Sequence, residues 1–210
     1  NRHAKKMLSG NYINDICFVG RLYEDNLFDE RVKNMPPVVV DYFNSIFEEA
    51  AFRWDGVNRI YGKTGGDMLR YMSIVNPEFH VDNRLDIEDT SLFEITYLIR
   101  KIANIERIAT LSTLSEMYHV VLHTSSKIEE GQLGNVEVRL PVKHGQDAAT
   151  VFAGSKINLN ISLKGIEGGT PQRVIDIMGA GGFVLTNYCE ETAALFEEDK
   201  EIVMFKTPEE

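Results

Sequence analysis

Residues 165–176 have the composition of an anion-binding loop that leads into a helix. Gly168 and Gly169 leave the loop almost without side chains, and Thr170 followed by Pro171 is typical of a helix start. Free backbone N–H groups and the helix dipole both favour a negative charge at such a start. The pattern therefore predicts an anion site at a helix that has Thr170 as its cap and Pro171 as its first residue.

Charged side chains flank this loop. Lys164 precedes it and Arg173 lies in the first turn of the predicted helix, so both could supply positive charge to a phosphate. Asp176 follows on the same helix, where a carboxylate can accept hydrogen bonds from a ribose diol. A glycine-rich turn without a ligand is the alternative interpretation, because such turns are common. The second glycine group, residues 178–182, is interpreted as a helix end and a turn into the next strand.

Strand ends supply further candidates, because ligands of open α/β sheets bind outside the carboxyl ends of the strands. Gly20 closes the apolar run of residues 15–20, and Arg21 follows it. A glycine there permits close approach of the backbone to a ligand, and an arginine suits a diphosphate. His123 ends a second predicted strand and is a candidate catalytic residue. The alternative for His123 is a capped histidine at the edge of solvent.

The segment GKTGG, residues 62–66, contains the Gly-Lys-Thr of a phosphate-binding P-loop. The complete motif needs a glycine five positions earlier, where this chain has Val57, and it must follow a strand. The upstream residues have a helical pattern instead. We therefore do not expect a nucleoside triphosphatase.

The second half of the chain has the pattern of an α/β protein. Predicted strands cover residues 15–20, 118–124, 135–142, 155–162, 182–187 and 201–205. Their apolar content is nearly continuous, as expected of strands that are covered on both faces. Helical segments separate several of them, which predicts a parallel sheet.

A large helical insertion, about residues 27–117, separates the first two strands. Its predicted helices cover residues 36–54, 67–74 and 89–117. In the last of these, one apolar face is predicted to contain Ile95, Leu98, Ile102, Ile105 and Ala109. The insertion could be a subdomain that packs on the sheet or one large crossover.

Composition excludes several classes of partner. The chain has 22 basic and 32 acidic residues and a net charge of -10, which argues against binding to nucleic acid or anionic lipid. The two cysteines, Cys17 and Cys189, are too few for a disulfide framework or a metal cluster and indicate a reducing, cytoplasmic setting. No apolar stretch is long enough for a transmembrane segment. The chain lacks an initial Met and stops at a Thr-Pro-Glu-Glu helix start, so we expect a fragment of a longer protein.

A family resemblance supports the same site. The segment VFAGSKINLNISLKGIEGGTPQRVIDIMGAGGFVLTNYCEE, preceded by FVGRLYEDN and ERIATLSTLSEMYHVVLHT, resembles the CgeB (spore maturation protein B) family of glycosyltransferase-like proteins. It is similar, more distantly, to the carboxy-terminal domain of retaining GT-B glycosyltransferases. The resemblance runs from about residue 14 to the end of the chain, and residues 155–187 are its most specific part.

The resemblance implies a single Rossmann-like domain, residues 1–210, that binds a nucleotide-sugar. The diphosphate would lie at the helix that starts near Pro171, and Asp176 would be the ribose-binding acid. The acid near the donor sugar would be Glu167, although its spacing to Asp176 is nine residues rather than the family's eight. Arg21, with either Lys164 or Arg173, would be the basic pair.

The same resemblance implies the remaining properties of the site. The base would lie near the backbone of residues 140–143, and neither a metal nor a cofactor would be needed. The chain would be the donor domain of a glycosyltransferase that uses an unknown acceptor, and the acceptor-binding amino-terminal domain would lie outside it. The alternatives are a non-catalytic protein-interaction module and a nucleotide-sugar epimerase.

Overall fold

The computed structural model describes residues 12–84, 87–143, 145–165 and 168–210, which contain one six-stranded parallel sheet. Its strands are β1 (Asn14–Val19), β2 (Val120–His123), β3 (Glu137–Arg139), β4 (Ser155–Asn160), β5 (Val184–Asn187) and β6 (Val203–Phe205). Their spatial order is β3-β2-β1-β4-β5-β6, and all neighbours run parallel. The predicted Rossmann-like α/β sheet is therefore confirmed, with the topological switch point between β1 and β4.

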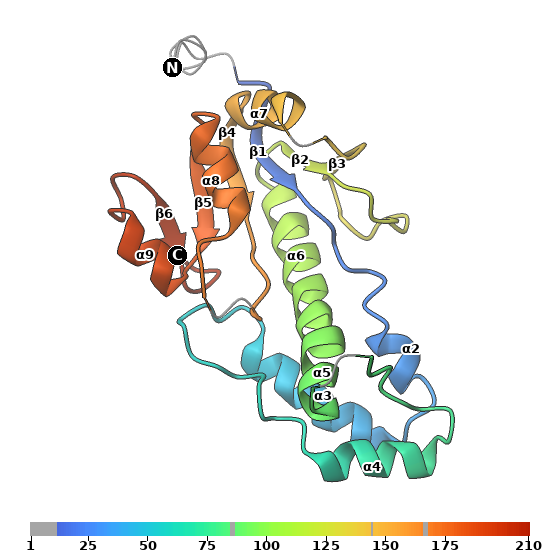
Figure 1. Ribbon diagram of the computed structural model, residues 1–210. Helices are drawn as coiled ribbons and strands as arrows, with labels where there is room; N and C mark the ends of the chain where they lie inside the picture. The colour runs from blue at the N-terminus through green and yellow to red at the C-terminus, as the bar shows by residue number, and fades with distance from the viewer. Residues whose placement is uncertain (1–11, 85–86, 144, 166–167) are drawn as a thin grey trace.

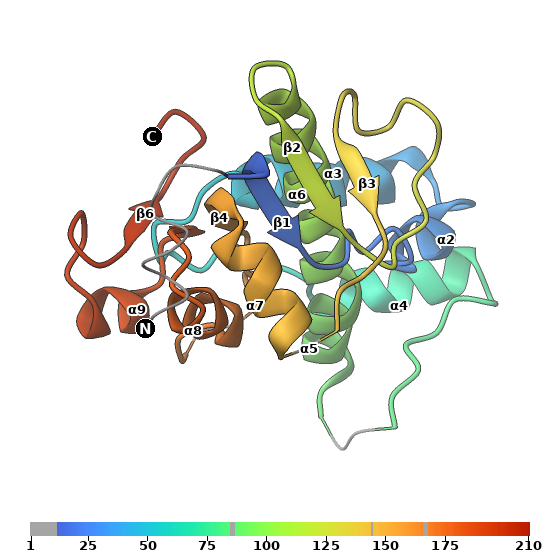
Figure 2. The ribbon, with the colours of Figure 1, turned by 90° about the horizontal axis from the view of Figure 1, so that it is seen from above.

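Helices cover both faces of this sheet (Figures 1 and 2). The helices among the described residues are α2 (Phe28–Val32), α3 (Pro37–Ala50), α4 (Gly66–Val75), α5 (Asp89–Phe93), α6 (Ile99–Ser115), α7 (Gln146–Ala153), α8 (Gln172–Gly179) and α9 (Glu190–Leu195), with a π-helix at Glu94–Leu98. Seen from above, α7 and α8 lie on one face and α6 crosses the other (Figure 2). Leu111 of α6 packs with Phe18 and Leu122, whereas Val174 of α8 packs with Val184.

The edge strand β3 departs from the predicted burial. We expected every strand to be covered on both faces, and β1, β2 and β4 are largely buried. In β3, however, Val138 is 45% exposed, and Leu140, just beyond the strand, is 86% exposed. The prediction is wrong there because β3 is the outermost strand, with a hydrogen-bonded neighbour only at β2.

The helical insertion lies between β1 and β2 and has a core of its own. Phe28 of α2 packs edge-to-face against Phe43 and Phe47 of α3, with ring centroids 5.3 and 5.0 Å apart. The long helix α6 joins this core to the sheet, because it starts among the insertion helices and ends beneath the strands (Figure 1). The insertion is therefore both a packed subdomain and the β1–β2 crossover, so the two alternatives are combined.

Two of the predicted helices differ from the observed ones. The helix predicted over residues 36–54 ends at Ala50, because Phe52 has a left-handed backbone with φ 59° and its N–H donates to the Glu106 carboxylate. The predicted apolar face of the long helix is wrong at Ile95, which is 45% exposed. The π-helical turn there contains more residues per turn, so the buried face shifts to Glu94 and Tyr97.

The second glycine group forms the expected helix end and turn. Gly181 adopts φ 77°, and the N–H groups of Gly181 and Gly182 donate to the carbonyls of Met178 and Ile177. Gly182 also allows close packing, since a Cβ there would lie 2.8 Å from Asn158 Nδ2 and 2.9 Å from Phe152 O. The interpretation of residues 178–182 as a structural turn is therefore confirmed.

We predict opposite effects for two alanine substitutions in this turn. Gly182→Ala should lower the free energy of unfolding by about 1–3 kcal/mol, because its methyl group overlaps backbone and side-chain atoms. Gly179→Ala is the matched control: a Cβ there meets nothing within 4 Å, so the helix should be unchanged or stabilised by up to about 1 kcal/mol. Urea unfolding of both variants measures the difference, and equal effects would contradict the packing argument.

Candidate functional site

The ends of β1, β2 and β3 meet at the carboxyl edge of the sheet and bring two predicted residues together. The N–H of Gly20 donates to the carbonyl of His123 over 3.0 Å. His123 is buried, and its Nδ1 lies 3.0 Å from the carbonyl oxygen of Leu140. Because a carbonyl only accepts, Nδ1 carries a proton, which leaves Nε2 as the acceptor when the ring is neutral.

The loop before α8 has the predicted glycines but a different cap. Gly169 adopts φ 87°, which favours glycine. Pro171, with ψ 130°, is the cap itself, and α8 begins at Gln172 without a side-chain cap hydrogen bond. The prediction that Thr170 caps this helix is wrong, because its Oγ1 instead accepts a hydrogen bond from the Thr192 hydroxyl over 3.3 Å. The loop is thereby tied to the start of α9.

Arg173 and Asp176 lie three residues apart on α8, a spacing that places them on neighbouring positions of one face. The guanidinium carbon of Arg173 lies 5.5 Å from the centroid of the Phe152 ring on α7. Asp176 is half-buried. The first turn of α8 thus carries a positive charge, and its second turn carries a carboxylate.

Arg107, which was not among the predicted site residues, braces the switch point between β1 and β4. Arg107 of α6 is buried, and its Nη1 and Nη2 donate to the carbonyls of Arg21 (2.6 Å) and Ile161 (2.5 Å). These carbonyls follow β1 and β4, so one guanidinium ties together the two strand ends. The available signal was a pair of adjacent charged residues, Glu106 and Arg107, inside an otherwise apolar stretch of helix.

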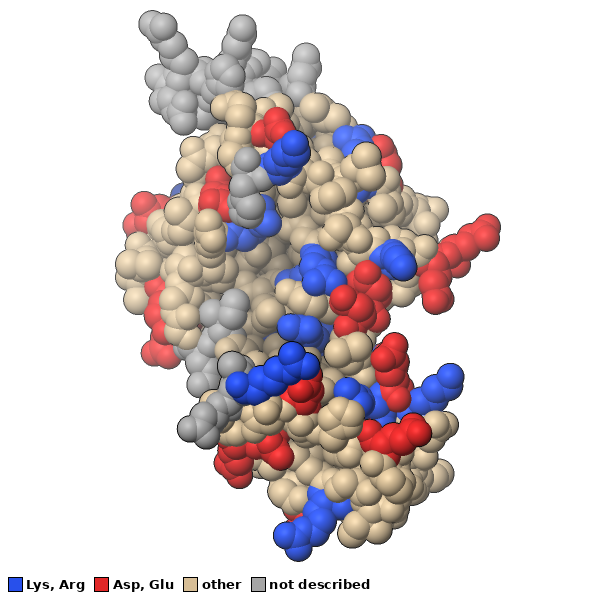
Figure 3. Space-filling view, turned by 45° about the vertical axis from the view of Figure 1, so that its right-hand side comes forward, with Lys and Arg blue, Asp and Glu red and all other residues tan. Residues whose placement is uncertain are grey.

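Two cations lie within electrostatic reach of each other at this point. Burial lowers the pKa of Arg107, Tyr23 and Glu106 counteract this fall, and the charge of Arg173 adds a smaller decrease. The Nε of Arg107 is buried without a hydrogen-bond partner among the described residues. On the face shown in Figure 3, Lys and Arg side chains, with Asp and Glu side chains among them, lie around a hollow between the sheet and the helical part.

The other two predicted cations already have partners. Arg21 forms an exposed ion pair with Asp25 over 2.5 Å. Lys164, whose side chain is only 11% exposed, forms an ion pair with the fully buried Glu106 over 3.1 Å. It also donates to the Arg53 carbonyl and lies 4.8 Å from the centroid of the Trp54 ring. Lys164 thus fastens the end of β4 to the insertion.

The Lys164–Glu106 pair is held in a site that disfavours both charges. Burial raises the pKa of Glu106, and Lys164 counteracts this rise. Burial also lowers the pKa of Lys164, and Glu106 counteracts that fall. Glu106 Oε2 has no hydrogen-bond partner among the described residues. The pair therefore depends on both members being present.

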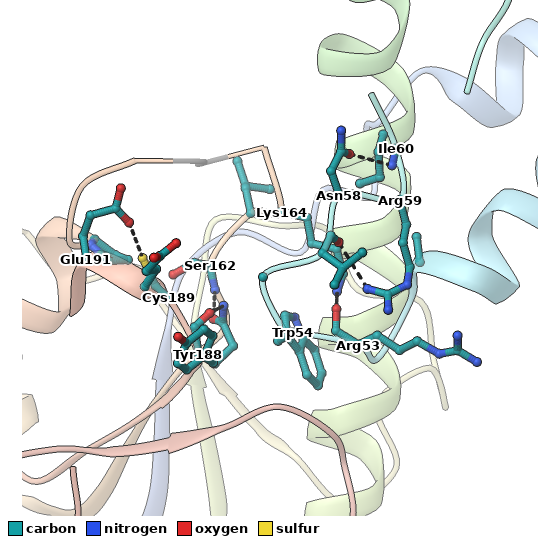
Figure 4. Close-up of a pocket in the computed structure, with 17 residues that line it drawn as sticks. Arg53, Trp54, Asn58, Arg59, Ile60, Ser162, Lys164, Tyr188, Cys189 and Glu191 are labelled. Atoms are coloured by element: carbon teal, nitrogen blue, oxygen red, sulfur yellow. Dashed lines mark hydrogen bonds between the residues drawn. The ribbon is translucent and has the colours of Figure 1, made fainter. Parts of the chain in front are cut away.

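A pocket of about 200 Å³ lies beside the loop, at the ends of β4 and β5. One wall comes from the segment after α3, including Arg53, Asn58 and Arg59, and the opposite wall includes Cys189 and Glu191 (Figure 4). Lys164 and Pro171 also line it, whereas the pocket does not include the other predicted site residues that the structure describes. Glu167, the predicted acid, lies outside the described residues.

The Gly-Lys-Thr loop binds an internal carboxylate. The N–H groups of Gly62 and Thr64 donate to the two oxygens of Glu94, over 3.0 and 2.6 Å. The loop follows the insertion helix α3 rather than a strand. The structure thus agrees with the prediction that this segment is not a P-loop.

Comparison with known proteins gives one match. A family model described as glycosyl transferase-like matches residues 102–210. The matched segment runs from within α6 to the end of the chain and includes every predicted site residue except Gly20 and Arg21. No curated protein and no solved structure matches the chain.

Among the described residues, the helices are too short or too polar to cross a membrane.

We predict that Lys164→Met lowers the free energy of unfolding by about 3–5 kcal/mol near neutral pH, because it leaves the Glu106 carboxylate buried without its cation. A carboxyl group whose folded pKa is raised stabilises the fold at low pH and loses that contribution as the pH rises. The loss should therefore shrink as the pH falls from about 7 to about 5. Urea unfolding at both pH values measures it.

The matched control is Lys200→Met, which breaks an exposed pair with Glu197 in which the lysine side chain is 70% exposed. Such a surface pair contributes about 0–1 kcal/mol, so this variant should unfold almost like the wild type. Equally small losses of unfolding free energy in both variants would show that the buried pair does not stabilise the contact between the end of β4 and the insertion.

Proposed function

We propose that this chain, which belongs to the glycosyl transferase-like family, is the donor-binding domain of a GT-B-type glycosyltransferase. In this proposal it binds a nucleoside diphosphate sugar, whose sugar is transferred to an acceptor. The family supplies the reaction class, and the nature of the donor is inferred from the site. A closer relationship to the CgeB family is part of the same proposal.

The observation that carries the proposal is the meeting of positive charges at the topological switch point. Arg107 holds the ends of β1 and β4, where Glu106 and Tyr23 offset part of its charge, and Arg173 of α8 lies within electrostatic reach of it. The amino end of α8 adds backbone N–H groups and the positive end of a helix dipole. In open α/β sheets this crevice is where nucleotides bind. A diphosphate would neutralise the charges that the protein has assembled there.

Individual roles follow from position. We assign the diphosphate to Arg173 and to the loop at Gly168 and Gly169, with Gly20 allowing its close approach. Arg173 is preferred over Lys164 as the partner of Arg21, because Lys164 is committed to Glu106. Asp176, in the second turn of α8, is assigned to the ribose diol.

Two residues are proposed to act near the sugar. His123 has its Nε2 as the acceptor of the neutral ring, so it is a candidate general base at the carboxyl edge. Glu167 remains the candidate acid of the loop before α8. The base of the nucleotide is proposed to lie near residues 140–143, beyond β3.

The departing diphosphate is proposed to need neither a metal nor a cofactor. Arg173 and the N–H groups at the start of α8 would stabilise its negative charge, because fixed dipoles and cations act strongly where water is excluded. Acceptor binding is assigned to an amino-terminal domain of the same protein. The two free cysteines, Cys17 and Cys189, suit a reducing compartment, so we place the reaction in the cytoplasm.

Calorimetric titration with UDP, GDP, ADP and their sugar conjugates tests the proposal. One nucleotide should bind saturably, and Arg173→Ala should weaken it by about 10- to 100-fold through loss of a charge-assisted hydrogen bond. Asp176→Ala should weaken it by about tenfold through loss of the ribose contact.

The controls are Arg100→Ala on α6 and Asp147→Ala on α7, which remove exposed charges of the same sign at other positions. Both should bind like the wild type. Absence of binding by every nucleotide, with the wild-type protein shown to be folded by circular dichroism, would exclude a donor site that functions in this chain alone.

A further inference from the structure

The glycine loop before α8 is in contact with a carboxylate from α9. Glu191 Oε1 lies 3.3 Å from the position that a Cβ on Gly168 would take. Its Oε2 lies 3.3 Å from Cys189 Sγ, and the same sulfur lies 3.7 Å from the carbonyl oxygen of Gly169. Thr192 holds the next residue, Thr170, through its hydroxyl. The start of α9 therefore fixes a negative side chain directly beside the proposed phosphate loop.

Glu191 is ionised at neutral pH. Its own backbone N–H, the Cys189 thiol and the Gly169 N–H hold its pKa below the ordinary value. A carboxylate has about four lone-pair positions, so it can accept further hydrogen bonds beyond these donors. Glu191 thus presents both a fixed negative charge and unused acceptor capacity.

The pocket that Glu191 lines is small and has both polar and apolar walls. Glu191 and Pro171 line it together with Asn58, Ser162 and Asn187 (Figure 4). Its volume of about 200 Å³ is below the roughly 300–1,000 Å³ of pockets for drug-sized ligands. It therefore has room for one ring rather than for a complete nucleotide.

We propose that Glu191 determines which group can be attached to the bound diphosphate. Its carboxylate accepts hydrogen bonds from the hydroxyl groups of a sugar and repels a further phosphate. This inference rests on the proposed function, because it takes the diphosphate to lie on the loop at Gly168 and Gly169. A nucleoside diphosphate sugar and a nucleoside triphosphate differ only in what is attached to the second phosphate. That group is the one that meets Glu191 and the pocket.

The two ligands have opposite interactions with this carboxylate. A sugar hydroxyl donates a hydrogen bond to it, whereas a third phosphate can only bring more negative charge. Two like charges about 6 Å apart at an effective dielectric constant of about 40 repel enough to weaken binding about tenfold. The chain thereby avoids occupation of its donor site by nucleoside triphosphates.

Isothermal titration tests the selectivity. The ligands are the diphosphate, the triphosphate and the glucose, galactose and N-acetylglucosamine conjugates of uridine, guanosine and adenosine diphosphate. The wild type should bind one sugar conjugate at least about tenfold more tightly than the triphosphate of the same nucleoside. In Glu191→Gln that ratio should fall to about one, with weaker binding of the conjugate and tighter binding of the triphosphate.

Glu198→Gln is the matched control, because it removes an equal charge from an exposed position beyond the end of α9. It should keep the wild-type ratio. Glu191→Ala should repeat the effect of Glu191→Gln, so that one poorly folded variant does not decide the outcome. An unchanged ratio in both Glu191 variants, with wild-type binding intact, overturns the role of Glu191 and leaves the donor site standing. Absence of binding by the folded wild type overturns both proposals.

Discussion

The buried guanidinium of Arg107 is the interaction on which the arrangement of the site depends. A parallel sheet leaves carbonyl groups exposed where its strands end, and at the switch point the chain leaves β1 and β4 in different directions. Arg107 satisfies the carbonyls of Arg21 and Ile161 with one planar group and so fixes the separation of the two strand ends. It also brings a charge that water does not solvate. The crevice is therefore braced by a buried cation before any ligand arrives.

The helical insertion is connected to the site through α6, the helix that carries Arg107. Glu106 and Arg107 are neighbours on α6, and they contact different partners: Glu106 pairs with Lys164 and accepts the Phe52 N–H, whereas Arg107 donates to carbonyls at the strand ends. The insertion core positions the first half of α6, and the sheet positions its second half. Changes in the insertion would therefore reach the site through two adjacent side chains.

Carboxylates satisfy two glycine-containing loops in this acidic protein. Glu94 accepts the N–H groups of Gly62 and Thr64 and is itself buried, so this loop is closed to ligands. Glu191 lies against Gly168 but faces a pocket, and guanidinium groups lie near the amino end of the following helix. In the first loop both N–H groups are taken by the buried carboxylate, whereas in the second Glu191 accepts the Gly169 N–H and, among the described residues, no side chain caps the amino end of α8.

The sequence alone determined the features that depend on local patterns. Near-continuous apolar runs indicated the parallel strands, and the glycine pair before Arg173 and Asp176 indicated the helix start at the carboxyl edge, because each is a matter of neighbouring residues. Tertiary structure decided what distant partners control. Lys164 is a structural cation because folding brings it to Glu106, which lies 58 positions earlier in the sequence. Thr170 does not cap α8, because its hydroxyl contacts Thr192 instead. Arg107 braces the site because folding brings the carbonyls of two distant residues to its guanidinium. The local sequence marks a charged pair in the helix but does not show these partners.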